Sequence, residues 1–246
     1  MAAFLARRCW SVDELLPGEA LELLRSAQAF ERFRAGSRPL RGTHVAVLCD
    51  APSSPSADAF TAAAASLGAA VVRLRPTVSR LRKGDDSVAV ARMLGRLYGA
   101  IECDGVEPEF MEELHRVSGV PVFSPVAGDT HPARLLGDLK TMCEHSGKPP
   151  GETTLCLCAA PGSPLTCAWQ RLAEMTGVCL CSKLPCLDHA AHESDFVCDP
   201  WHRSQEGSPP KLLALDRATG RTVPLLGRQI ENHRFVVQAM LSTSVH

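Results

Sequence analysis

The sequence lacks any long apolar run and any long run of charges of one sign. No stretch approaches the roughly eighteen consecutive apolar residues of a membrane-spanning helix, so we expect no membrane span. The longest basic cluster, Arg80–Lys83, is followed directly by Asp85 and Asp86, and the formal net charge is only -1. This balance argues against a surface that binds nucleic acid or anionic membranes.

The first residues lack the features of a secretory signal. Met1–Arg8 contains an apolar stretch of only six residues, which is too short for the apolar core of such a signal. The same segment carries Arg7 and Arg8 and has no acidic residue before Asp13. A short organellar targeting segment is therefore the alternative to the cytoplasmic location that we expect.

The cysteine spacing typical of a zinc knuckle is also lacking. The eleven cysteines are an odd number in a chain too large to need a disulfide framework, which favours reduced, buried thiols. We expect no metal and no cofactor. The alternative is a metal module whose ligands would be Cys179, Cys181, Cys186, His189, His192 and Cys198.

What the sequence does contain is a regular alternation of short apolar runs and amphipathic segments. Thr43–Cys49 and Ala70–Leu74 predict buried strands, and the segment from about Ser56 to Leu67 predicts a helix that ends at Gly68. The alternation predicts parallel β–α–β units. It continues with helices at about 87–97, 107–118 and 131–145 and strands at 100–103 and 120–123.

Ser146–Gly151 is the clearest linker in the chain. After it we expect strands at 154–158 and 178–181 with a helix between them, a less regular stretch at 196–201 and a closing helix at about 229–241. The predicted fold is α/β, with two doubly wound parallel-sheet lobes. The first lobe would span residues 1–148, and the second, reduced lobe residues 149–246, with the C-terminal helix packing back on the first.

Three places beside predicted strand ends carry candidate ligand groups. Ser53, Ser54 and Ser56 lie where a strand ends and a helix begins, a position that favours anions but here contains no cation of its own. The alternative is a loop in which Ser56 merely caps the helix. His131 precedes another helix, where a neutral imidazole can donate a hydrogen bond to the carbonyl group of a substrate. The alternative is a purely structural histidine. Asp199 closes a later apolar run.

Together these segments resemble the ornithine and aspartate carbamoyltransferase family, over nearly the whole chain and more closely the ornithine branch. Family members carry Ser-Thr-Arg-Thr-Arg in the loop after the first strand, and Ser53–Ala57 falls in register with it. His131–Arg134 resembles the family's His-Pro-x-Gln, and Asp199–Trp201 the start of an amino-acid-binding segment. Further matches are Asp138, Thr141, Glu144-His145 and Glu231-Asn232-His233.

The resemblance implies a site for carbamoyl phosphate, or another small anion, and an amino acid, between the subunits of a homotrimer. In such a site His131 would polarise the carbamoyl oxygen and Asp199 would hold the acceptor amine. Ser79 and Lys83 resemble a loop that reaches into the neighbouring subunit's site; the alternative is a solvated basic turn. The residues implied for carbamoyl phosphate are Ser53, Ser54, Ser56, Ser79, Lys83 and Arg134.

Three of the departures from the family pattern remove arginines. Pro55 and Ala57 replace the loop arginines, and Asp104 replaces the arginine that ends a later strand motif. Each charge-assisted hydrogen bond to a phosphate is worth about 1.5–3 kcal/mol, so three losses amount to roughly 5–9 kcal/mol if they add. We therefore expect a divergent homologue with weak or lost carbamoyl transfer. The alternative is an active transferase in which Lys83 acts in trans.

Overall fold

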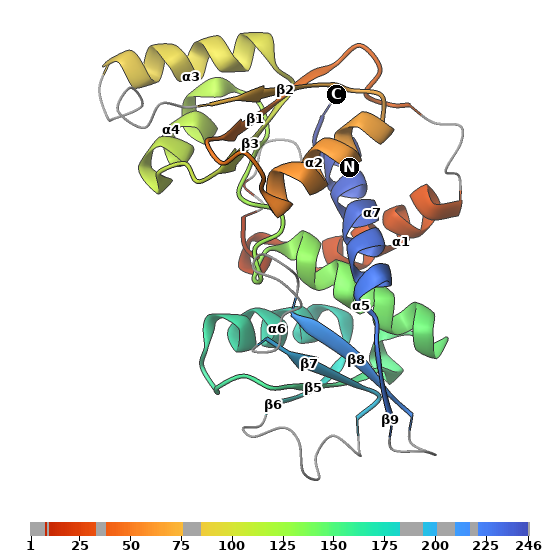
Figure 1. The fold of residues 1–246 in the computed structure, drawn as a ribbon. Helices are drawn as coiled ribbons and strands as arrows, with labels where there is room; N and C mark the ends of the chain where they lie inside the picture. The colour runs from red at the N-terminus through yellow and green to blue at the C-terminus, as the bar shows by residue number, and fades with distance from the viewer. Residues whose placement is uncertain are drawn as a thin grey trace.

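A computed structural model describes residues 8, 10–32, 38–75, 85–182, 194–200, 210–216 and 221–245. Within these residues the chain forms two sheets, one above the other in Figure 1, with a group of long helices between them. None of the described helices is long and apolar enough to cross a membrane.

The first sheet has four parallel strands in the order β2-β1-β3-β4. Val45 and Val47 of β1 face one buried cluster while Ala46 and Leu48 face another, because helices cover both faces of the sheet. This confirms the predicted parallel sheet. The elements are β1 His44–Cys49, α2 Pro55–Ser66, β2 Ala70–Leu74, α3 Asp85–Leu97, β3 Ala100–Asp104, α4 Pro108–Ser118 and β4 Val122–Phe123.

The second sheet is mixed, in the order β6-β5-β7-β8-β9. Strands β6, β5 and β7 are parallel, but β8 and β9 run antiparallel, so the expectation of a wholly parallel second sheet is wrong at this edge. The connections before β8 and β9 are only eleven and four residues long, and a parallel return needs a crossover of a dozen or more residues, so these strands return antiparallel. The elements are β5 Thr154–Leu157, α6 Pro164–Thr176, β6 Cys179–Ser182, β7 Phe196–Asp199, β8 Lys211–Asp216 and β9 Arg221–Pro224.

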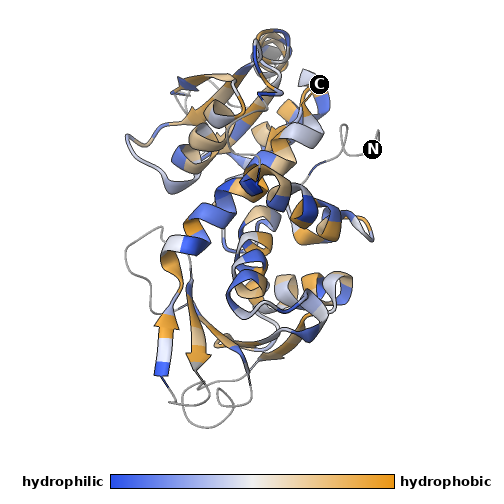
Figure 2. Ribbon diagram, turned by 90° about the vertical axis from the view of Figure 1, so that its right-hand side faces the viewer, coloured by the Kyte–Doolittle hydropathy of each residue, from blue (hydrophilic) through white to orange (hydrophobic). Residues whose placement is uncertain are grey.

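Three helices pack together between the sheets: α1 Glu19–Arg32, α5 Pro132–Ser146 and α7 Leu226–Ser244. The C-terminal helix α7 also contacts α2, which confirms that it packs back on the first lobe. Gly137 of α5 permits the close crossing with α7, since a Cβ there would lie 2.8 Å from the Cα of His233. Figure 2 shows that the first turns of α7 are largely hydrophilic, whereas the strands are largely hydrophobic.

Candidate functional site

The loop after β1 contains Ser53, Ser54 and Ser56 and is called the serine loop below. It directs two of its hydroxyls toward the end of β3. Ser54 caps α2, since its Oγ accepts a hydrogen bond from the N–H of Ala57 at 3.2 Å, and the same hydroxyl donates to Asp104 Oδ2. Ser56 Oγ donates to Glu102 Oε1 at 2.8 Å. These contacts follow from the sheet, because β1 and β3 pair in parallel with Cys49 beside Asp104.

The remaining loop residues differ in exposure. Ser53 is exposed and has no hydrogen-bond partner among the described residues, so the structure does not bring it together with Ser54 and Ser56. Pro55 is also exposed at the first position of α2. Ala57 is fully buried. Of the two positions where the family has arginines, only Pro55 faces solvent.

Arg73 of β2 brings a positive charge to this loop from a neighbouring strand. Its Nη2 donates to the carbonyl of Ala51 at 3.2 Å and lies 3.4 Å from Cys49 Sγ, and its Nη1 lies 3.5 Å from Asp58 Oδ1. No motif in the sequence reveals Arg73. The available signal is topological: β2 runs parallel beside β1, so residues near the ends of both strands meet at one edge.

Glu102 is a buried acid beneath the loop. Burial, together with the nearby charge of Asp104, raises the pKa of Glu102 to about 8, although the hydrogen bond from Ser56 opposes the shift. Its Oε2 atom has no hydrogen-bond partner in the part of the chain that the structure describes. At neutral pH this carboxyl group is therefore mostly protonated.

His131 and Arg134 lie at the start of α5, beside the serine loop. His131 is buried at the N-cap, and its Nδ1 accepts a hydrogen bond from the N–H of Ala133 at 3.1 Å, which leaves Nε2 as the protonated nitrogen of the neutral ring. Arg134 is buried one turn before Asp138. Burial raises the pKa of Asp138 to about 6, and the charge of Arg134 opposes the shift.

The backbone of Val126 and Ala127 connects the serine loop to this cluster. The N–H of Ala127 donates to Ser56 Oγ at 3.2 Å, and the carbonyl of Val126 accepts from His233 Nε2 at 2.8 Å. Burial and the charge of Arg134 lower the pKa of His233 well below its usual value, so its ring is neutral. The two groups of predicted residues thus adjoin each other.

Asp199 ends β7 in the second sheet. Burial raises the pKa of the neighbouring Cys198 thiol, and the charges of Asp138, Asp129 and Asp199 add to the shift. The end of β7 therefore lies within electrostatic reach of α5. The roles of Asp199, His131 and Arg134 stay predictions.

Some predicted residues lie outside the described part of the chain. These are Ser79 and Lys83 of the basic loop, Trp201, and three of the six potential metal ligands, Cys186, His189 and His192. The described residues contain no cluster of three or more metal-ligating side chains. Cys158 is disulfide-bonded, so the expectation of reduced thiols is wrong at this position.

Several other residues that match the family pattern form a joint between α5 and α7. Asn232 Nδ2 donates to Thr141 Oγ1 at 3.0 Å and to Glu144 Oε2 at 2.7 Å. Gln229 Nε2 donates to Asp138 Oδ1 at 2.9 Å. The side chains at these matched positions hold α5 and α7 together. Their spacing in the sequence does not reveal this packing role.

The sequence profile of the aspartate/ornithine carbamoyltransferase carbamoyl-P binding domain matches residues 7–144, more than half of the chain. The chain belongs to the aspartate/ornithine carbamoyltransferase family. The predicted family is thereby confirmed.

Two curated relatives of this carbamoyltransferase homologue are ornithine carbamoyltransferases. The catabolic enzyme of Pseudomonas putida is 35% identical over 129 residues, which are 52% of this chain and 38% of the relative. The enzyme of Neisseria meningitidis is 44% identical over 95 residues, which are 39% of this chain and 36% of the relative. The matched stretches thus span little more than a third of these relatives.

Solved structures share the fold over the whole chain. A putative aspartate carbamoyltransferase from Trypanosoma cruzi has a TM-score of 0.73 at 17% identity, covering 100% of this chain and 99% of that one. Aspartate transcarbamoylase from the same organism, solved with carbamoyl phosphate and aspartate, has a TM-score of 0.71 at 18% identity, with 100% and 98% covered. At this identity the similarity shows the fold alone.

Proposed function

We propose that this chain is a divergent carbamoyltransferase homologue in which ordinary carbamoyl transfer is weak or lost. One observation carries the proposal: the hydroxyl of Ser54, which caps α2, donates to the carboxyl group of Asp104, and the hydroxyl of Ser56 in the first turn of α2 donates to that of Glu102. A phosphate at this loop would have to break both hydrogen bonds. It would also face Asp104 where a cation is needed, which adds repulsion.

The expected loss of affinity is large. Two hydrogen bonds to a phosphate are worth about 3–6 kcal/mol together if they add, a factor on the order of 10²–10⁴ in binding. Arg73 does not simply replace the missing cations, because its guanidinium already contacts the Ala51 carbonyl and Asp58. The loop therefore supports weak anion binding at most.

The second candidate is an active transferase that moves a carbamoyl group from carbamoyl phosphate to the amine of an amino acid. The amine nitrogen would bond to the carbamoyl carbon, the bond from that carbon to the phosphate oxygen would break, and the amine would lose a proton. Two observations favour it: Arg73 contacts the loop, and the hydrogen bond from Ala133 to His131 Nδ1 leaves Nε2 as the donor nitrogen of a neutral ring. In this mechanism that nitrogen would donate to the carbamoyl oxygen. Asp199 would hold the amine, and Lys83 would act in trans.

A turnover assay separates the two candidates. The protein is incubated with carbamoyl phosphate and either ornithine or aspartate, and the ureido product is measured. We expect no product above the level without protein. Turnover of about 1 s⁻¹ or faster, within the usual range of enzymes, would overturn the first proposal in favour of the second.

A variant designed to bind phosphate more tightly tests why the serine loop has lost affinity for phosphate. Pro55→Arg combined with Asp104→Asn adds a cation at an exposed loop position and removes the opposing charge, and we expect phosphate to bind at least tenfold more tightly by calorimetry. Pro164→Arg with Asp104→Asn is the matched control, because Pro164 is the exposed first residue of α6 and follows a serine N-cap. Equal affinities in the two variants would contradict the assignment of the site to the serine loop.

We also infer a homotrimer and a cytoplasmic location from the family resemblance, with a carbamoyl-phosphate-binding-like domain at residues 1–148 and a reduced amino-acid-binding-like domain at 149–246. Analytical ultracentrifugation over a range of concentrations tests the trimer. Sedimentation as a monomer throughout would contradict it, and would also remove the route by which Lys83 could act in trans.

A further inference from the structure

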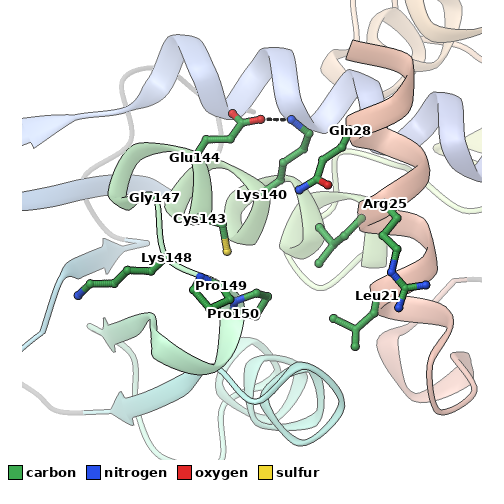
Figure 3. Close-up of a pocket in the computed structure, with 11 residues that line it drawn as sticks. Leu21, Arg25, Gln28, Lys140, Cys143, Glu144, Gly147, Lys148, Pro149 and Pro150 are labelled. Atoms are coloured by element: carbon green, nitrogen blue, oxygen red, sulfur yellow. Dashed lines mark hydrogen bonds and ion pairs between the residues drawn. The ribbon is translucent and has the colours of Figure 1, made fainter. Parts of the chain in front are cut away.

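A cleft of about 590 Å³ lies between α1, α5 and the turn that leads from α5 to β5 (Figure 3). Small-molecule sites usually measure about 300–1,000 Å³, so the cleft is large enough for a small ligand. It shares no lining residue with the serine loop or with the cluster at His131. A ligand bound there would be independent of the carbamoyl-phosphate-like site.

Two helix faces form the walls of the cleft. Leu21, Leu24, Arg25 and Gln28 lie at the spacing that places them on one face of α1. The opposite wall comes from α5 and the turn after it, including Cys143, Pro149 and Pro150. Each wall thus combines an apolar part with polar groups.

Most charged groups at the cleft already have partners. Lys140 contacts Glu31 Oε2 at 2.6 Å, Asn232 Oδ1 at 3.1 Å and Glu144. Glu144 is neutralised by Lys140 and Arg228. The other lysine, Lys148, forms an ion pair with Asp195 at 2.7 Å and points away from the space between α1 and α5 in Figure 3.

Arg25 is different, because its side chain forms no ion pair or hydrogen bond with any described residue. The same holds for Gln28, three residues further along the same face of α1. Figure 3 shows both side chains extending from α1 at the cleft. Together they supply a guanidinium and an amide that are available to a ligand.

We propose that this cleft binds a small organic carboxylate with a short apolar body. Arg25 would hold the carboxylate through paired hydrogen bonds, and Gln28 would donate another from its amide. The apolar body would lie against Leu21, Leu24 and the Pro149-Pro150 turn. The lining favours an anion at Arg25, since the other charged side chains of the cleft, Lys140, Lys148 and Glu144, already form ion pairs.

The position of the cleft gives the ligand a structural effect. It would contact α1, α5 and the turn that leads to β5 at the same time, and Lys140 at its edge bonds to Asn232 of α7. A bound carboxylate would therefore stabilise the arrangement of the helices that separate the two sheets. Binding to the folded state raises the melting temperature in proportion to the logarithm of the ligand concentration.

Calorimetry with hexanoate tests the proposal. We expect saturable binding to the wild-type protein, binding at least tenfold weaker in Arg25→Met, and an intermediate loss in Arg25→Lys, which keeps the charge but not the planar fork. Arg92→Met is the matched control, since Arg92 is likewise an exposed helical arginine without a described partner, on α3. Hexylamine, with the same chain and the opposite charge, should not bind. No saturable binding of hexanoate, or equal affinity in Arg25→Met, would overturn the proposal.

A second measurement needs no variant. Cys143 lines the cleft and is partly buried, whereas Cys167 on α6 is exposed and does not line it. Hexanoate should slow the alkylation of Cys143 by iodoacetamide and leave that of Cys167 unchanged, as measured by peptide mass spectrometry. Unchanged alkylation of Cys143 at saturating hexanoate would exclude this cleft. Failure here leaves the proposed function untouched, because the turnover assay reports on the serine loop.

Discussion

Acidic side chains have opposite surroundings in two regions of the molecule. One is the serine loop (Ser53, Ser54, Ser56), and the other is the joint between α5 and α7, to which α1 adds Glu31. At the loop, Glu102 is buried and faces a hydroxyl, and its pKa is raised to about 8. At the joint, partial burial also raises the pKa of Glu31, but hydrogen bonds from Lys140 and Arg228 outweigh it and lower the pKa to about 2. The difference lies in the cations that reach each carboxylate.

This contrast explains which matches to the family pattern the structure uses. At the joint, the matched residues Thr141, Glu144 and Asn232 contact one another and hold the helices together. At the loop, Pro55 and Ala57 stand where the family has arginines, and the carboxyl groups of Asp104 and Glu102 accept hydrogen bonds from the hydroxyls of Ser54 and Ser56. The matched residues of the joint thus have a packing role that the structure shows, whereas the altered ligand-binding role of the loop is our proposal.

Removing the central cation of the joint should have the largest effect. Lys140→Met leaves Glu31 and Glu144 without their buried partner and Asn232 Oδ1 without a donor. We expect the free energy of unfolding, measured in urea, to fall by about 3–5 kcal/mol. Arg171→Met, at the exposed Arg171–Glu174 pair, is the control and should change it by less than about 1 kcal/mol. Equal losses would show that the joint is no stronger than a surface ion pair.

The pH dependence of stability should differ between the two regions. Because the pKa of Glu102 is higher in the folded state, its contribution is fully present below about pH 4.5 and is lost as the pH rises through about 8. The slope is about 1.4 kcal/mol per pH unit at most. Glu102→Gln removes this dependence, so its stability relative to wild type should rise by about 3 kcal/mol between pH 5 and pH 8.

Glu31 should behave in the opposite sense. Its lowered pKa contributes stability that is present above about pH 4.5 and is lost as the pH falls toward 2. For Glu102, urea denaturation curves of wild type and Glu102→Gln at several pH values measure the difference in the free energy of unfolding between the two proteins. A constant difference from pH 5 to pH 8 would mean that Glu102 ionises normally in the folded protein.

The close crossing of α5 and α7 should tolerate no added side chain. Gly137→Ala places a Cβ within 2.8 Å of the His233 Cα and 2.9 Å of its nitrogen, so we expect a loss of about 2 kcal/mol in urea denaturation. Gly227→Ala in the first turn of α7 is the control, since no heavy atom lies within 4 Å of its added Cβ. The control should be neutral or slightly stabilising. An equally neutral Gly137→Ala would show that the crossing can open without cost.

The smallest expected effect compares two serine N-caps. Ser54→Ala removes the cap of α2 and the donor to Asp104, whereas Ser163→Ala removes only the cap of α6 and its contact with Thr166. Each cap is worth about 1 kcal/mol. If the Ser54 hydroxyl serves only the fold, both variants should lose similar stability and neither should change phosphate affinity. A selective loss of phosphate affinity in Ser54→Ala would favour a working anion site.

The sequence by itself determined the local elements and the family. The strand at His44–Cys49, the helix that follows it and the start of α5 at Pro132 agree with the apolar pattern and the turn residues, because these depend on neighbours along the chain. The matches at His131–Arg134 and Ser53–Ala57 pointed to the carbamoyltransferase family that the profile confirms. The antiparallel edge of the second sheet was not predicted.

Only the tertiary structure decided what surrounds each candidate residue. The position of Arg73 at the loop depends on β2 lying beside β1, and the donation from Ser54 to Asp104 depends on the register between β1 and β3. The joint unites Thr141 with Asn232, residues 91 positions apart. Such contacts, and the pKa shifts that follow from them, depend on which distant segments meet and on how much water they exclude, which local sequence patterns do not contain.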